Sequence, residues 1–190
     1  MKFSIALTAV SFAAFASAAP AGGPGLENFY CNQARDARGT RNGVFNQGCL
    51  ELVDDCLNTL NTTHSADIWG VKHCVGAAFC DGTENLLHLA KCQNQAIDST
   101  DGTSPSLNYN IWAGIVGDCA WNPEGSCPMT RQNFIDFVYG SFSDINIAPD
   151  AYPDSSLVIK NWWDPLKEWT ATGNTIPYLN LNDWLHYSQS

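Results

Sequence analysis

The sequence predicts an all-α fold: a single disulfide-stapled helical domain over residues 26–190 that contains a disulfide-bracketed helical hairpin. Two observations lead to this prediction. Eight cysteines follow an N-terminal export signal, and an even number of cysteines in an exported chain indicates disulfides. Apolar residues also recur every three to four positions along most of the chain, as they do on one face of a helix, and no segment alternates convincingly as a strand would.

The N-terminus has the features of a secretory signal peptide over residues 1–18. Lys2 precedes a nearly unbroken apolar run at residues 3–15, and an Ala-Ser-Ala cleavage site ends at Ala18. The apolar run is shorter than the roughly 20 residues that cross a membrane. We therefore expect a secreted, extracellular protein of 172 residues, after removal of 18 from the 190, that begins with a flexible leader at residues 19–25.

The chain is strongly acidic. Its net charge is −10, and loss of the one lysine in the signal peptide would make it −11. An acidic surface repels phosphate groups, so we expect neither nucleic acid nor an anionic membrane as a partner.

The spacing of four cysteines predicts the hairpin. Residues 46–60 have the apolar periodicity of a helix, with Cys49 and Cys56 on one face. Two turns, about 11 Å of rise, separate these two cysteines, so they cannot bridge each other. A turn at residues 61–64 would then return the chain as a second helix over residues 66–79.

Ser65 is the predicted N-cap of this second helix. With the two helices antiparallel, Cys56 faces Cys74 and Cys49 faces Cys80, so we expect the disulfides Cys49–Cys80 and Cys56–Cys74. A step of six residues rotates a helix by about 240° from Cys74. Cys80 is therefore expected to lie past the end of the second helix.

The other four cysteines form two further predicted pairs. Cys119 and Cys127 flank a Pro/Gly turn, which favours a local disulfide and leaves Cys31 for Cys92. Eight cysteines allow 105 pairings in principle, so this set is a prediction among many. No Cys-x-x-Cys pair suggests zinc, and an even count leaves no thiolate for haem, so we expect no metal and no cofactor.

The remaining segments are also predicted to be mostly helical. Helices are expected at residues 26–38, 83–97, 106–119, from Thr130 to about 145, from Ser155 to about 170 with Pro165 as a kink or break, and from Asn182 to 187. Residues 36–43 and 146–154 are predicted loops, and residues 175–179 are predicted to be extended.

One sequence motif predicts a modification. Asn61-Thr62-Thr63 is a sequon for N-glycosylation on a turn that we expect to be exposed. In an exported protein the location suits the modification of Asn61.

Aromatic residues in the C-terminal third supply the candidate contact surface. Trp162, Leu166 and Trp169 fit one buried helical stripe, from which Trp163 points away. Exposed aromatic rings can stack on sugars or anchor a partner protein. The predicted partner or ligand contacts are Trp163, Tyr178 and Trp184.

No catalytic residue is predicted. The four histidines belong to no recognised metal or nucleophile motif, and no Gly-x-Ser-x-Gly sequence is present. Asp183 and His186 could form a dyad, but a surface hydrogen bond explains that spacing as well. Asp164 and Glu168, four residues apart, are typical of a solvated helix face.

Five segments of the chain form a distinctive set, namely NWWDPL (161–166), WTATG (169–173), IPY (176–178), NDWLHY (182–187) and residues 61–74. These segments resemble a family of small secreted, cysteine-containing proteins of mushroom-forming fungi, most of which have no assigned activity. The resemblance implies a secreted protein and carries no catalytic residues. The non-catalytic small subunit of heterodimeric fungal laccases is similar in size, secretion and acidity.

These observations lead to three functional hypotheses. The first is a secreted non-catalytic binding protein that stabilises another secreted protein as an accessory subunit. The second is a carbohydrate-binding, lectin-like protein whose ligand is a glycan. The third is a secreted hydrolase of unrecognised type, which would need a cleft that joins a histidine to a carboxylate from a distant segment.

Overall fold

The computed structural model describes residues 24–97, 103–122 and 127–190, with side chains from Phe29 onward. The predicted signal peptide and most of the leader lie outside the described residues. Pro24 and Gly25, predicted to belong to the leader, instead form the start of the first helix, since proline suits the first turn of a helix. None of the described helices is long and apolar enough to cross a membrane.

The chain folds as an all-α domain, as predicted, with two very small antiparallel sheets. The N-terminal region comprises α1 (Pro24–Ala37), β1 (Thr40–Arg41), β2 (Val44–Phe45), α2 (Gln47–Thr63), the 3₁₀ turn η1 (Ile68–Gly70), α3 (Lys72–Asp81) and α4 (Thr83–Gln93). The C-terminal region comprises α5 (Tyr109–Val116), the 3₁₀ turn η2 (Asp118–Trp121), β3 (Met129–Thr130), α6 (Arg131–Asp144), the 3₁₀ turn η3 (Pro149–Ala151), α7 (Ser155–Leu157), the π-helical η4 (Val158–Trp163), α8 (Asp164–Thr170), β4 (Thr175–Ile176) and α9 (Tyr178–Tyr187).

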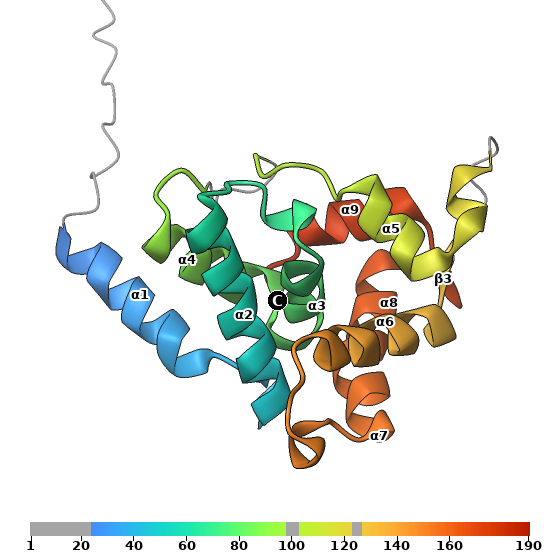
Figure 1. Ribbon diagram of the computed structural model, residues 1–190, viewed down its shortest axis with the longest axis horizontal. Coiled ribbons are helices and arrows are strands. Elements are labelled where there is room, and N and C mark those ends of the chain that lie inside the picture. Colours follow the sequence, from blue (N-terminus) through green and yellow to red (C-terminus); the bar gives the residue numbers. More distant parts are fainter. Residues whose placement is uncertain (1–23, 98–102, 123–126) are drawn as a thin grey trace, which may run out of the picture.

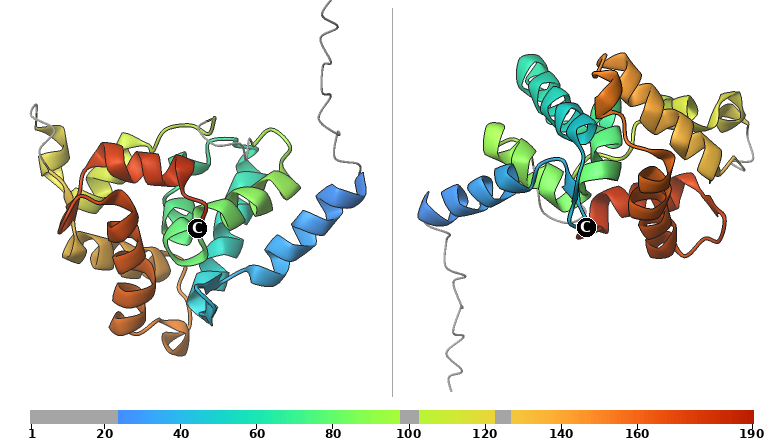
Figure 2. Two further views of the ribbon diagram at one scale, coloured as in Figure 1. Left: turned by 180° about the vertical axis from the view of Figure 1, so that it is seen from behind. Right: turned by 90° about the horizontal axis from the view of Figure 1, so that it is seen from below.

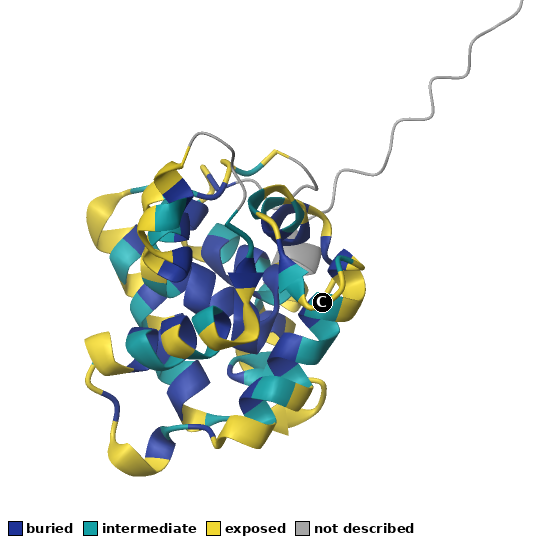
Figure 3. Ribbon diagram, turned by 90° about the vertical axis from the view of Figure 1, so that its right-hand side faces the viewer, coloured by how far each residue is buried: buried dark blue, intermediate teal, exposed yellow. Residues whose placement is uncertain are grey.

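Helix α3 is the centre of the fold. It packs against α2 and α4 on one side and against α6 and η4 on the other, as Figure 1 shows. Every residue from Cys74 to Asp81 is buried, and Figure 3 shows this buried interior surrounded by exposed outer helix faces. A Cβ at Gly76 would lie 3.1 Å from both the Leu52 side chain and the Ser141 hydroxyl. Glycine at this position therefore lets α2 and α6 approach α3 closely.

The structure contains the four predicted disulfides, with Cα–Cα distances that disulfides normally span. The pairs are Cys31–Cys92 at 5.9 Å, Cys49–Cys80 at 5.8 Å, Cys56–Cys74 at 4.8 Å and Cys119–Cys127 at 5.7 Å. One detail of the prediction was wrong, because Cys80 lies inside α3 and not beyond its end. The close approach of α2 at Gly76 lets both cysteines of α3 reach α2 from within the helix.

The connection between the two hairpin helices starts later than predicted and is longer. Helix α2 continues through Thr63 and ends where His64 adopts a left-handed conformation, with φ of 52°. Ser65 does not cap α3, since its hydroxyl accepts a hydrogen bond from the Asp67 amide ahead of η1. Helix α3 therefore begins only at Lys72, after a 3₁₀ turn that the apolar periodicity did not reveal.

Of two predicted helix starts in the C-terminal region, one is confirmed and one is wrong. Thr130 caps α6 as predicted, and the Asn133 side chain completes a reciprocal capping box. Helix α9, in contrast, begins at Tyr178 directly after Pro177 and not at Asn182. The Asn182 side chain instead accepts a hydrogen bond from the Leu107 amide, 2.9 Å away, and so ties α9 to the segment before α5.

Pro165 changes the helical path before it without breaking the helix. It lacks an amide hydrogen and cannot bond to the carbonyl of Asn161, and the preceding residues widen into the π-helical η4. The Asn42 side chain donates a hydrogen bond to this carbonyl at 3.1 Å. The β1–β2 hairpin thereby replaces the bond that Pro165 cannot make.

Candidate functional site

Two of the three predicted contact residues belong to the core. Trp163 and Trp184 are only 2% and 1% exposed, so the prediction that they form a contact surface was wrong. The π-helical turn brings both Trp162 and Trp163 inward, and Trp163 packs 5.3 Å from the ring of Phe134. Trp184 is stacked on Phe79 at 5.6 Å.

Tyr178, the third predicted contact, is half-buried. Its hydroxyl donates a hydrogen bond to the Leu107 carbonyl at 2.7 Å, and burial raises the pKa of this phenol. Trp169, predicted to be buried, is 44% exposed. A regular helix would have buried Trp169 and exposed Trp163. With the widened turn at η4, Trp163 is buried and Trp169 is exposed.

Exposed aromatic side chains of the described residues lie in both regions, and three of them lie in the N-terminal region together with an exposed valine. Phe29 and Tyr30 on α1 are 60% and 54% exposed, and Phe45 on β2 is 56% exposed next to the exposed Val44. Tyr30 lies against the ring of His88 on α4, with 6.4 Å between ring centroids. We call these four apolar residues, Phe29, Tyr30, Val44 and Phe45, the aromatic edge.

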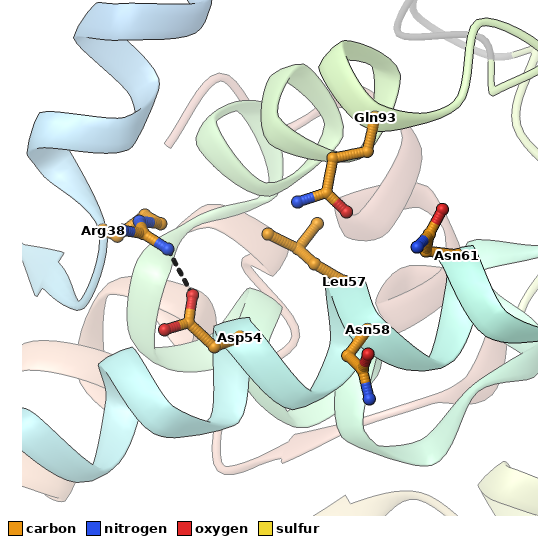
Figure 4. A pocket seen from close by; sticks show the side chains of 6 residues that line it. All are labelled: Arg38, Asp54, Leu57, Asn58, Asn61 and Gln93. Carbon is orange, nitrogen blue, oxygen red and sulfur yellow. Dashed lines mark hydrogen bonds and ion pairs between the residues drawn. The ribbon is translucent and has the colours of Figure 1, made fainter.

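A hollow of about 510 Å³ lies between the end of α1, α2 and α4 (Figure 4). Leu57 forms its apolar floor, and an ion pair between Arg38 and Asp54 closes one end. The predicted glycosylation site Asn61 lines the opposite end and is exposed in the last turn of α2. A glycan on Asn61 would therefore project from the rim of this hollow.

A polar cluster joins three helices around His73. Its Nδ1 lies 2.5 Å from the Asp55 carboxylate on α2, and its Nε2 lies 3.6 Å from the Asp144 carboxylate on α6. Lys72 bonds the same Asp144 carboxylate at 2.5 Å and holds its pKa below the usual value. A histidine base needs a nucleophile at its free nitrogen, whereas here a second carboxylate approaches that nitrogen.

The remaining polar candidates have structural roles. The His186 ring lies between the carbonyls of Asn182, at 2.6 Å, and Ser104, at 2.8 Å, so it makes no dyad with the exposed Asp183. Within the part of the chain that the structure describes, no group of three or more His, Cys, Asp or Glu side chains could hold a metal ion.

A second hollow, of about 290 Å³, contains a buried cation. We call it the Arg41 hollow. The Arg41 side chain is 5% exposed, and its Nε and Nη1 atoms are buried without a hydrogen-bond partner. The guanidinium lies 5.7 Å from the ring of Trp184, and exposed Trp169 and half-buried Pro165 from α8 also line the hollow.

Asp81 is the described acidic side chain whose charge acts on Arg41, yet its oxygens bond elsewhere. Oδ1 accepts a hydrogen bond from the Gly39 amide at 2.7 Å, and Oδ2 accepts one from the Asn85 side chain at 2.8 Å. Burial raises the pKa of Asp81 to about 6, and burial also lowers the pKa of Arg41 to about 10 in spite of the Asp81 charge. Arg41 therefore remains a cation at neutral pH without a direct partner.

Arg41 was not among the predicted site residues, since it lies in the predicted loop at residues 36–43, which has no apolar periodicity. Arg41 is the second residue of the two-residue strand β1, and nothing in the neighbouring sequence predicts that it is buried. Comparison of the chain with family models, with curated proteins and with solved structures gives no match.

Proposed function

We propose that this protein is a secreted, non-catalytic binding protein that associates with another secreted protein as an accessory subunit. The observation that carries the proposal is the aromatic edge. Three of its side chains, Phe29, Tyr30 and Phe45, are each more than half exposed, although aromatic residues mostly fill cores. Aromatic residues are enriched where one protein buries its surface against another.

The disulfides support a rigid binding surface. Cys31–Cys92 joins α1, which carries Phe29 and Tyr30, to α4. A surface that is already ordered loses less conformational entropy on association, so more of the interaction free energy appears as affinity. Four disulfides together with the export signal also favour an extracellular setting.

A hydrolase is the less favoured reading because of the His73 cluster. It does join a histidine to carboxylates from distant helices, but both ring nitrogens face carboxylates and the hollows described above do not include His73. An accessory role also agrees with the resemblance in size, secretion and acidity to the small subunits of fungal laccases.

Size-exclusion chromatography of native culture fluid, with mass spectrometry of each fraction, tests the proposal. We expect stoichiometric co-elution with a larger secreted protein, and loss of that co-elution in a Phe29→Ser/Phe45→Ser variant. Leu179→Ser is the matched control, since Leu179 is an exposed apolar residue on α9 outside the aromatic edge. Elution of the protein alone near its own mass, or equal co-elution of both variants, would contradict the proposal.

A carbohydrate-binding function is the second candidate, and Trp169 is the observation that favours it. The ring is 44% exposed beside the Arg41 hollow, where a sugar ring could stack on it. Retention of the protein on an immobilised glycan, and its loss in Trp169→Ala, would support this candidate.

A further inference from the structure

We propose that the Arg41 hollow binds a small ligand in which a single carboxylate is attached to a ring. The carboxylate would bond to Arg41, and the ring would lie against Trp169. The hollow shares the β1–β2 hairpin with the aromatic edge, since Arg41 pairs with Val44, but none of the four aromatic-edge residues lines it. The inference therefore goes beyond the accessory role and stands without it.

The guanidinium of Arg41 is buried without a hydrogen-bonded partner for Nε and Nη1. A buried charge normally has a hydrogen-bonded partner, since burial without one is costly. Two buried nitrogen atoms of Arg41, Nε and Nη1, have no partner, and Asp81, the one described acidic side chain acting on it, has its oxygens bonded to Gly39 and Asn85. The oxygen of Ser190 lies near Nη1 but makes no hydrogen bond to it, so the charge of Arg41 is open to a ligand.

The residues around Arg41 hold the guanidinium in place but do not accept hydrogen bonds from its Nε and Nη1 atoms. Trp184, itself buried against Phe79, lies 5.7 Å from it and provides a cation–π contact. The Nη1 atom and the backbone oxygen of Ser190 both lie against Gly82, yet no hydrogen bond joins them. Figure 2 shows the red C-terminal segment reaching the green α3–α4 junction, so that Ser190 forms one wall of the hollow.

The chemistry of the Arg41 hollow favours a ligand with one carboxylate. A carboxylate bridges two neighbouring N–H groups of a guanidinium in one plane, here Nη2 with either Nε or Nη1, so a carboxylate is the preferred anion for such a donor. The lining also includes the exposed Glu168, and the whole chain has a net charge of −10. Both features oppose a polyanion, so the ligand should carry one negative charge.

The size and lining of the Arg41 hollow suit a single ring. A hollow of about 290 Å³ is at the lower end of small-ligand sites, which span roughly 300–1,000 Å³. It can hold one ring with its carboxylate. Trp169 and Pro165 offer apolar surfaces on which either a sugar ring or an aromatic ring can lie. A uronic acid and an aromatic acid share the proposed chemistry.

Titration followed by the indole N–H signals in protein NMR spectra tests the inference. The probes are galacturonate with galactose as its neutral match, and benzoate with benzyl alcohol as its neutral match. We expect one or both acids to shift the signals of Trp169 and Trp184 with a Kd of about 1 mM, as for ligands of about ten heavy atoms. The neutral matches should bind at least tenfold more weakly.

Two variants locate the site. Arg41→Gln should weaken acid binding by about tenfold or more, because it removes the charged donor. Trp169→Ala should weaken it by about two- to tenfold, and this exposed residue can be replaced without opening the core. Trp121→Ala, which removes an exposed tryptophan on η2, is the matched control and should leave the affinity unchanged.

The outcomes separate the ligand sources and can overturn the inference. Binding of galacturonate alone assigns a uronic acid, and binding of benzoate alone assigns an aromatic acid. Binding of neither acid, or equal binding of acids and neutral matches to the unmodified protein, would overturn it even if Arg41→Gln failed to fold. Neither result affects co-elution through the aromatic edge, so the two proposals fail independently.

Discussion

The two regions of this protein are held together by different means. Three of the four disulfides lie within α1–α4, where they link α1 to α4 and α2 twice to α3. The region α5–α9 contains only the local pair Cys119–Cys127, and large aromatic side chains fill its core. Cysteine spacing on a helix translates directly into which residues can meet, whereas the direction of an aromatic side chain depends on details of the turn that carries it.

The two regions meet at α3. Phe79 on this helix lies 4.8 Å from Phe134 of α6 and 5.6 Å from Trp184 of α9. The covalent framework of the first region therefore holds the surface on which the aromatic core of the second region packs. Perturbing either side should test how far each region depends on the other.

The largest expected effect comes from the aromatic core. Trp163→Ala should lower the free energy of unfolding by about 3–5 kcal/mol, the usual cost when a buried large aromatic residue is truncated. Trp163 is almost fully buried and packs against Phe134, so the surroundings would have to collapse around a large void. Denaturant unfolding followed by circular dichroism measures the change.

Trp169→Ala is the matched control, since the same residue type six positions away is 44% exposed. Its effect should stay within about 0.5 kcal/mol, as for most surface changes. If Trp169→Ala proved as destabilising as Trp163→Ala, the assignment of the two tryptophans to core and surface would have to be reversed.

The next largest effect should come from the disulfides of the N-terminal region. Replacing Cys49 and Cys80 together by alanine releases a loop of 31 residues and should cost about 4 kcal/mol by the loop-entropy relation. The control is the double alanine variant of Cys119 and Cys127, eight residues apart, for which the same relation gives about 2.5 kcal/mol. If loss of the local pair Cys119–Cys127 lowered the free energy of unfolding more, the N-terminal region would not be the one that depends more on its disulfides.

This contrast also explains how much could be predicted from the sequence. The all-α class and the four disulfide pairs followed from periodicity and from helical rise, because both depend only on spacing along the chain. The burial of Trp163 could not be predicted, since Pro165 widens the preceding turn and a regular 100° step no longer applies. Trp184 was misassigned for a related reason, because α9 begins four residues earlier than its predicted cap at Asn182.

The Arg41 hollow was beyond prediction for another reason. Its parts come from the β1–β2 hairpin, from α8, from α9 and from Ser190, and only the tertiary fold brings them together. Asn42 reaches the carbonyl that Pro165 leaves free, so the hairpin next to Arg41 is fixed by a defect in a distant helix. No local pattern encodes such a pairing over more than a hundred residues.

Asp81, at the end of α3, gives the smallest predicted effect. Burial raises its pKa to about 6 from the ordinary value of 3.8. Above pH 6 the carboxylate is ionised in both the folded and the unfolded chain, and the folded chain bears the cost of burying the charge. Below about pH 4 both forms are protonated and this cost is absent. The contribution of Asp81 to stability therefore falls as the pH rises from about 4 to about 6.

Asp81→Asn should remove this pH dependence while it keeps a group that can accept the Gly39 hydrogen bond. The difference in unfolding free energy between the variant and the unmodified protein should move in favour of the variant by up to about 3 kcal/mol between pH 4 and pH 7, because each pKa unit corresponds to about 1.4 kcal/mol. Asp183→Asn, on the exposed face of α9, gives the baseline for removing one carboxylate. If the difference for Asp81→Asn stayed as constant with pH as that baseline, Asp81 would be ionised at no cost. Asp81 and Arg41 would then form a compensated ion pair, and Arg41 would have no uncompensated charge to offer a ligand.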